Sequence, residues 1–181
     1  MDSDLFIKKI TLERDKIDNY DVYPFNIDVV RQLNEIKFNK PVTFLVGENG
    51  VGKSTFIEAL AVSVGLNAEG GSQNFNFSTQ NTHSNLSDYI RVSRFNKPKL
   101  KFFLRAESFY NVASEIIRIS EEGSQFIMAT HSPILISYID GEIMDLNNNF
   151  EIVKYEDTEI YKTYKMYLDD PYRMQEMLFR E

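Results

Sequence analysis

The sequence predicts an α/β fold with a mainly parallel sheet. Strand-like and helix-like segments alternate along most of the chain, which is typical of parallel strands joined by crossover helices. The apolar run Val42–Val46 ends at a glycine, as expected of a buried parallel strand. Residues 47–54 then form a glycine-rich segment directly before a helix-like pattern. A strand, a tight loop and a helix are therefore expected in succession.

The first half of the chain contains the elements around this loop. Residues 6–12 favour an early strand, which precedes the strand at 42–46. Apolar residues at helical spacing predict a helix that begins near Lys53 and ends at Gly65. These residues are Ile57, Leu60, Ala61 and Val64. Residues 67–85 are rich in Asn, Ser, Gly, Gln and Thr, so we expect a polar loop or an inserted lobe over residues 66–99.

The second half of the chain alternates in the same way. Strands are expected at 100–104, 125–129, 142–146 and 150–155, and a turn at 147–149 joins the last two. Helices are expected around 109–116, in the turn that begins at Pro133, around 160–168 and after Asp170. Asp170 and Pro171 suit the cap and the first turn of that last helix.

Composition and charge exclude several classes of protein. The chain of 181 residues has 20 Lys and Arg against 27 Asp and Glu, a formal net charge of -7. A broad electrostatic contact with nucleic acid is therefore disfavoured, although a local basic patch stays open. The absence of cysteine excludes disulfides, thiolate zinc sites and cysteine nucleophiles. The first residues lack the order of a signal peptide, and no apolar run approaches the roughly 18 residues that cross a bilayer. We expect a cytoplasmic protein without a membrane span.

The segment Gly47-Glu-Asn-Gly-Val-Gly-Lys-Ser54 matches G-x-x-x-x-G-K-[ST], the pattern of a phosphate-binding P-loop. Its glycines permit positive φ and let backbone N–H groups approach a phosphate, and the following helix adds its positive end. Lys53 is expected to bridge the terminal phosphates, and Ser54 to offer its hydroxyl to Mg²⁺. The predicted nucleotide-binding residues are Gly47, Glu48, Asn49, Gly50, Val51, Gly52, Lys53, Ser54 and Thr55. Tyr23 or Phe25 could stack on the base, but core packing is the expected place for both.

The run from Phe44 to Leu60 resembles ABC-type ATPases of the branch that includes chromosome-maintenance and repair ATPases. It is most similar to a family of small bacterial ATPases described as AAA or ABC ATP-binding proteins. Residues 65–79, 102–111, 125–135 and 155–159 carry the same likeness. The resemblance implies a P-loop NTPase with an ABC-ATPase-like three-layer sandwich, formed by a single nucleotide-binding domain over residues 1–181. It also implies binding of ATP with Mg²⁺ and, in the intact family, hydrolysis that drives a partner.

The resemblance also implies two catalytic residues. His131, in Thr130-His-Ser-Pro133, matches the switch histidine that contacts the γ-phosphate or the attacking water. It follows a predicted parallel strand, at the edge of the sheet where ligands of open α/β sheets gather. Glu107 lies about where the family's metal- and water-contacting loop begins; as an alternative, it is an acid in the first turn of a helix. His83, in the polar segment, is expected to be a surface residue.

Part of the family pattern is missing. A Ser/Gly-rich signature motif and an apolar strand ending in Asp-Glu should precede the histidine motif, but neither is visible there. The segment Ile134–Asp140 imitates such a strand, yet it follows His131 and has Gly141 where Glu belongs, so Asp140 is expected to be a surface acid. We expect an internal deletion between Ile117 and Ser124, whether natural, engineered or an omitted segment. We also predict that the strand at 100–104 fills the vacant place beside 125–129.

Two functions remain for this chain. One is an ATPase that couples ATP binding and hydrolysis to a change in a partner. The other is a nucleotide-binding module with little or no hydrolysis, because the missing motifs would supply positioning and charge for phosphoryl transfer. A P-loop kinase of small molecules would leave residues 129–133 without a role. The protein partner is unknown, a homodimer stays open, and nucleic-acid binding has no support from the net charge.

Overall fold

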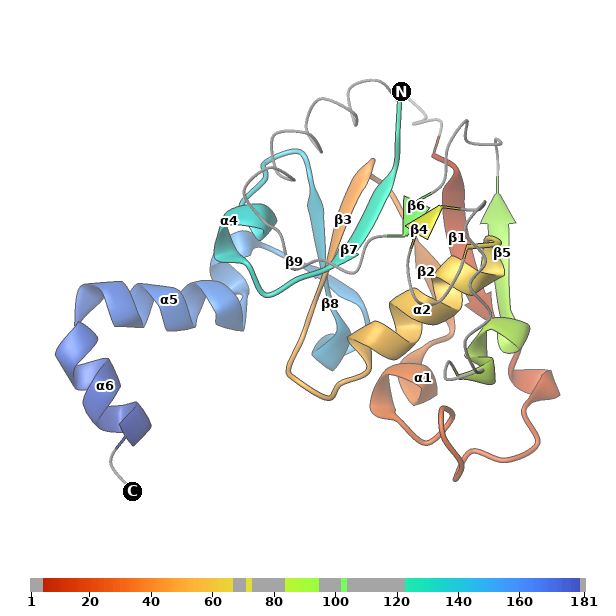
Figure 1. The fold of residues 1–181 in the computed structure, drawn as a ribbon, viewed down its shortest axis with the longest axis horizontal. Helices are drawn as coiled ribbons and strands as arrows, with labels where there is room; N and C mark the ends of the chain where they lie inside the picture. Colours follow the sequence, from red (N-terminus) through yellow and green to blue (C-terminus); the bar gives the residue numbers. More distant parts are fainter. Residues whose placement is uncertain (1–4, 67–70, 73–83, 95–101, 104–122, 180–181) are drawn as a thin grey trace.

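The computed structural model describes residues 5–66, 71–72, 84–94, 102–103 and 123–179 (Figure 1). A first, antiparallel sheet has the order β2 (Glu35–Lys37), β1 (Ile7–Leu12) and β5 (Ile90–Arg94). A second sheet has the order β7 (Phe126–Ala129), β3 (Val42–Val46), β8 (Glu142–Asp145) and β9 (Glu151–Val153). In it β3 runs parallel to both β7 and β8, and β9 is antiparallel to β8. The strands β4 (Gly71–Ser72) and β6 (Phe102–Phe103) form a separate antiparallel pair.

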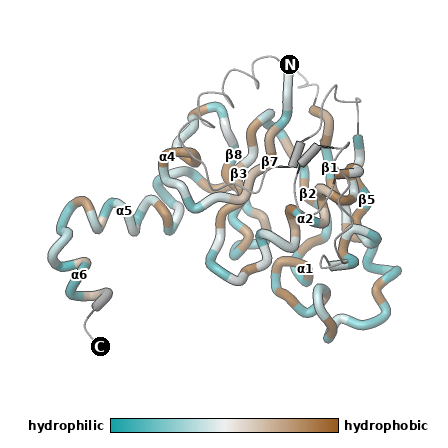
Figure 2. The backbone as a smooth tube through the Cα atoms, viewed as in Figure 1, coloured by the Kyte–Doolittle hydropathy of each residue, from teal (hydrophilic) through white to brown (hydrophobic). Residues whose placement is uncertain are grey.

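Helices and short helical turns lie between these strands and after the last of them. The α-helices are α1 (Asp28–Gln32), α2 (Lys53–Ser63), α4 (Pro133–Ile136), α5 (Glu159–Asp169) and α6 (Pro171–Phe179). The 3-10 turns are η1 (Arg14–Lys16), η2 (Asn85–Tyr89), η3 (Leu146–Asn148) and η4 (Tyr155–Asp157). Figure 2 shows α5 and α6 extending away from the two sheets, with hydrophobic and hydrophilic residues interleaved along them. Within the described ranges, no helix combines the length and the apolar character that a membrane crossing requires.

The strand β3 lies at the centre of the second sheet, and all five of its residues are buried. Successive side chains of a strand point to opposite faces. One face of β3 therefore carries Val42, Phe44 and Val46. These side chains pack with Leu135 and Ile136 of α4, in a cluster separate from the one that contains Leu45. Leu45 faces the other way, toward α2. The parallel part of the sheet thus carries helices on both faces, which is compatible with an α/β fold.

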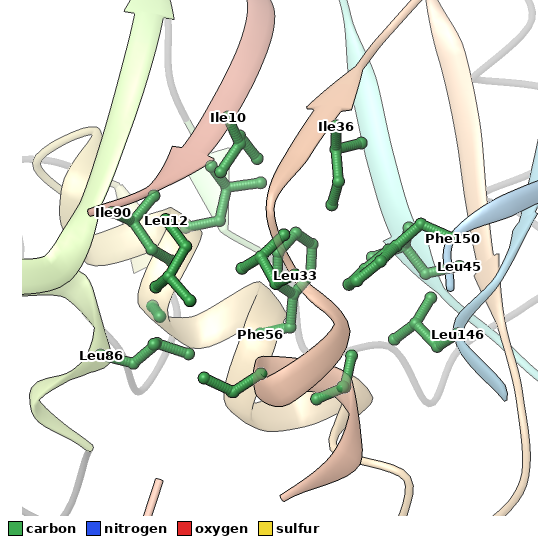
Figure 3. Close-up of a cluster of buried hydrophobic side chains, with 14 of the residues drawn as sticks. Ile10, Leu12, Leu33, Ile36, Leu45, Phe56, Leu86, Ile90, Leu146 and Phe150 are labelled. Atoms are coloured by element: carbon green, nitrogen blue, oxygen red, sulfur yellow. The ribbon is translucent and has the colours of Figure 1, made fainter. Parts of the chain in front are cut away.

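The helix α2 packs against both sheets and forms the largest hydrophobic cluster (Figure 3). Ile10 and Ile90 reach it from the first sheet, and Leu45 from the second. Phe56 of α2 lies within this cluster and is 0% exposed. A helix held in this way presents its first turn at a fixed place relative to the end of β3.

Most of the predicted elements are confirmed. The strand at 42–46 has the predicted bounds, and α2 begins at the predicted residue. The strands expected near 6–12, 125–129, 142–146 and 150–155 are β1, β7, β8 and β9, and the helices expected after Pro133, around 160–168 and after Asp170 are α4, α5 and α6. The helix expected around 109–116 lies outside the described residues.

Two expectations need correction. The strand at 100–104 was expected beside β7, but its described part, β6, pairs with β4 instead. The prediction assumed a parallel crossover, whereas β6 has an antiparallel partner earlier in the chain. The expectation of a mainly parallel sheet holds for the second sheet, where β3 is parallel to β7 and β8, but it did not include the first, because β1, β2 and β5 form a wholly antiparallel sheet. The segment 66–99, which was expected to be a polar loop or an inserted lobe, contains β5. Its residues 90–94 therefore belong to the antiparallel sheet.

Candidate functional site

The loop between β3 and α2 has the backbone that its glycines were expected to permit. Gly47, Gly50 and Gly52 have φ values of +146°, +86° and +106°, which side-chain-bearing residues rarely adopt. Two of these glycines also leave no space for a side chain. A Cβ atom at Gly52 would lie 2.5 Å from Val29 Cγ1, and one at Gly47 would lie 2.6 Å from Asn147 Oδ1. The loop is therefore enclosed from two sides, by α1 and by the turn after β8.

The start of α2 is open to an anion. Gly52 is the N-cap and offers no side-chain acceptor to the first turn, which contains no acidic residue. Among the described residues, the backbone N–H groups of Gly52, Lys53 and Ser54 donate to no acceptor. Free N–H groups and the positive end of a helix together favour bound negative charge.

Lys53 brings a positive charge to the same place. Its side chain is 9% exposed, and its Nζ donates to the carbonyl oxygens of Gly47 and Glu48, both at 2.7 Å. Among the described residues no carboxylate pairs with this ammonium group. Burial lowers the pKa of Lys53, since a desolvated ammonium group is less stable than a hydrated one. The site therefore contains a buried positive charge whose partners are neutral oxygens.

His131 lies at the edge of the sheet where this loop begins. It follows β7, which pairs with β3 in a register that joins Ala129 to Leu45, and Thr130 N–H donates to Leu45 O at 3.3 Å. Burial lowers the pKa of His131, and the positive charge of Lys53 lowers it further. The structure thus brings these two predicted site residues close enough for their charges to interact.

The turn that carries His131 is fixed by side-chain hydrogen bonds. Thr130 is buried, and its Oγ1 accepts a hydrogen bond from Ser132 N–H at 3.0 Å. Ser132 caps α4, because its Oγ accepts from Leu135 N–H at 3.4 Å, and Pro133 follows as the first helical residue. The flanking residues of the predicted motif therefore hold the backbone on both sides of the histidine.

The two aromatic candidates for base stacking differ. Phe25 is in the core, as expected, and makes an edge contact with Tyr89. Core packing was the wrong expectation for Tyr23, whose side chain is 59% exposed. The Tyr23 hydroxyl lies 3.1 Å from Thr55 Oγ1, at the first turn of α2. An exposed aromatic ring is therefore anchored beside the loop. Ser54, which precedes Thr55 in the chain, is exposed as well.

Sequence reasoning missed Asn147, which contacts the loop directly. Its Oδ1 accepts a hydrogen bond from Glu48 N–H at 2.9 Å. The sequence pattern indicated only a turn between strands at residues 147–149. The available signal was their place after β8, because the carboxyl ends of parallel strands meet at one edge of the sheet.

Of the remaining candidates, only residues 134–140 lie in the described part of the chain. Residues 134–140 form α4 and a turn, not a strand, and Asp140 is exposed, as predicted. Glu107 and His83 lie outside the described residues. In the part of the chain that the structure describes, no group of three or more His, Cys, Asp or Glu could hold a metal ion.

Comparison with known families gives a match over most of the chain. A family model described as AAA domain matches residues 16–173, a range that contains both the loop and His131. Neither the comparison with curated proteins nor that with solved structures gave a match.

Proposed function

Because the chain belongs to the AAA domain family, a family of nucleotide-binding P-loop ATPases, we propose that its loop at residues 47–55 binds Mg-ATP. The single observation that carries this proposal is the buried ammonium group of Lys53. Its partners are two backbone carbonyl oxygens, which leave its full charge uncompensated in a partly desolvated place. Burying an unpaired charge is unfavourable, so an anion that enters this site gains a strong electrostatic partner.

The rest of the loop fits a triphosphate better than a simple anion. The N–H groups at the start of α2 have no acceptor among the described residues, and phosphate oxygens would supply several at once. Ser54 is exposed in the first turn of the helix, where its hydroxyl can reach a cation that accompanies the phosphates. Mg²⁺, when bound, would neutralise part of the charge on the β- and γ-phosphates. Tyr23 supplies an exposed ring for the base.

His131 has the charge state that a phosphate-sensing histidine needs. With its pKa held below the usual value by burial and by Lys53, the imidazole is neutral at pH 7 and can either donate or accept a hydrogen bond. We assign it the role of contacting the γ-phosphate or the attacking water.

Hydrolysis is the finer part of the proposal. An ATPase needs a carboxylate to hold the metal and a group that positions water. Glu107 is the residue that the sequence offers for contact with the metal and the water. The second candidate function, a nucleotide-binding module with very slow turnover, is favoured by the form of residues 134–140. They are helix and turn, so they cannot supply a strand that ends in an acidic pair.

Calorimetric titration with Mg-ATP and a phosphate-release assay separate these functions. The key variant is Lys53→Ala, and the matched control is Lys37→Ala, which removes an exposed lysine of β2 with the same change in net charge. We expect saturable binding in the wild type and in Lys37→Ala, and strongly weakened binding in Lys53→Ala. Phosphate release that Lys53→Ala abolishes supports an ATPase, and binding without release supports the module. Equal affinity of the wild type and Lys53→Ala refutes the proposed site.

A further inference from the structure

The turn after β8 packs against the P-loop at Gly47, where a side chain on residue 47 would take the space of the turn. Asn147 Oδ1 accepts the hydrogen bond from Glu48 N–H at 2.9 Å. The same oxygen would lie 2.6 Å from a Cβ atom at residue 47, which is far inside van der Waals contact. Gly47 therefore allows the Asn147 amide to lie directly against the backbone at the start of the loop.

The turn that carries Asn147 is itself held in position. Asp145, the last residue of β8, accepts a hydrogen bond from Asn147 N–H at 2.9 Å through its Oδ1. Two residues later, Asn149 has a φ of +52° and donates its N–H to Gln32 Oε1 of α1 at 3.1 Å. The turn is thus fixed at both ends, to β8 and to α1.

The second end of the loop is held by α1 as well. Val29 of α1 lies so close to Gly52 that a Cβ atom there would be 2.5 Å from its Cγ1. The P-loop, the turn at 145–149 and α1 therefore form a closed set of contacts, in which Asn147 provides the hydrogen bond to the loop backbone.

This hydrogen bond sets the orientation of one peptide group. Because Glu48 N–H points to Asn147, it is turned away from an anion in the loop, while Gly47 O of the same peptide group accepts from Lys53 Nζ at 2.7 Å. The N–H groups of Gly52, Lys53 and Ser54 stay without an acceptor among the described residues. The loop is thereby divided into a fixed first half and a second half that is available to phosphate.

We propose that Asn147 is a positioning residue that holds the P-loop in its phosphate-binding conformation, an inference that rests on the nucleotide binding proposed above. A loop that is already ordered loses less conformational freedom when the ligand binds. Asn147 is exposed, so its removal opens no cavity in the core, and its effect should fall on binding rather than on the stability of the fold.

The test compares Asn147→Ala with Asn148→Ala. Asn148 lies in the same turn and is also exposed, but its Nδ2 donates to Glu151 Oε2 at 2.8 Å and not to the loop. Calorimetric titration with Mg-ATP should show roughly 3–10-fold weaker binding for Asn147→Ala, the worth of about one hydrogen bond. Asn148→Ala should bind like the wild type, and the two variants should unfold at similar temperatures.

Amide hydrogen exchange of Glu48, measured by NMR in the protein without nucleotide, provides an independent readout. Exchange should become faster in Asn147→Ala and stay unchanged in Asn148→Ala. Asn147→Asp retains an acceptor oxygen, so it should restore slow exchange, while its negative charge weakens ATP binding more at low salt than at high salt.

The outcomes decide between the inference and its premise. Wild-type affinity for Mg-ATP in Asn147→Ala overturns the inference, and so does unchanged exchange at Glu48. A lower unfolding temperature without any change in affinity means that the residue is merely structural. If the wild type binds no ATP, the proposed function falls, and the exchange at Glu48 still decides whether Asn147 holds the loop.

Discussion

Replacing Gly52 with alanine should destabilise the fold and weaken nucleotide binding, because the added methyl group meets α1. Gly52 has a φ of +106°, and an alanine in the left-handed region is strained by about 1–2 kcal/mol. The new Cβ atom would lie 2.5 Å from Val29 Cγ1 and 2.8 Å from Ile27 Cδ1. The end of the Ile27 side chain can move, but Val29 is buried and β-branched, so its methyl group has no free rotamer.

The magnitude follows from these two terms. Overpacking of a filled site costs about 1–3 kcal/mol, so Gly52→Ala should lower the free energy of unfolding by about 2–5 kcal/mol. Gly50→Ala is the matched control, since Gly50 has a φ of +86° but no described atom lies within 4 Å of the place that its added methyl group would take. It should show the backbone strain alone, about 1–2 kcal/mol.

Equilibrium unfolding in urea, followed by circular dichroism, measures both free energies. The difference between the variants, about 1–3 kcal/mol, reports the contact between the loop and α1. If Gly52→Ala proves as stable as Gly50→Ala, then α1 does not enclose the loop, and close packing does not explain the glycine at this position.

Four further predictions concern other parts of the site and the core. Lys53→Ala should raise the pKa of His131 in an NMR titration, and an unchanged pKa would mean that the two charges do not interact. Because folding lowers the pKa of His131, the wild type should also lose stability as the pH falls below about 6.5. The variant His131→Gln should lose less stability over the same change in pH. Tyr23→Ala should weaken ATP binding in a calorimetric titration. Tyr23→Phe, which loses only the hydrogen bond to Thr55, should bind nearly as well as the wild type. If Tyr23→Ala binds ATP as tightly as the wild type, base stacking on Tyr23 is excluded. Glu142→Ala should lower the free energy of unfolding in urea by about 1–3 kcal/mol, because it leaves the buried Thr43 hydroxyl without its acceptor. ATP affinity should not change, because Glu142 lies at the opposite end of the sheet from the loop.

The central elements could be predicted from the sequence because their signals are local. A largely apolar strand, a glycine at each positive-φ position of the loop and a helix that begins at Lys53 all follow from residues adjacent in the chain. The place of His131 also followed from a local signal, since a strand precedes it and Pro133 starts the next helix. Local chemistry alone determines these features.

The parts that could not be predicted depend on contacts between distant residues. The predicted apolar stripe of α2 omitted Phe56 and Ala59, which are buried because this helix packs against two sheets rather than one. The pairing of β6 with β4 was missed for a related reason, as nothing in a two-residue strand specifies its partner. Tyr23 carries no sequence signal that distinguishes it from Phe25, although the fold exposes one ring and buries the other.

The geometry of the loop joins these two kinds of information. Its own residues provide the strained glycines and the lysine, but they do not by themselves select one orientation for the peptide group between Gly47 and Glu48. That orientation is set by Asn147, which is distant in the chain and reaches the loop because β8 lies beside β3. Lys53 then bonds to Gly47 O, which is the carbonyl oxygen of this same peptide group. A P-loop motif therefore predicts the chemistry of phosphate binding, whereas the readiness of the loop to bind depends on the strand that the fold places next to it.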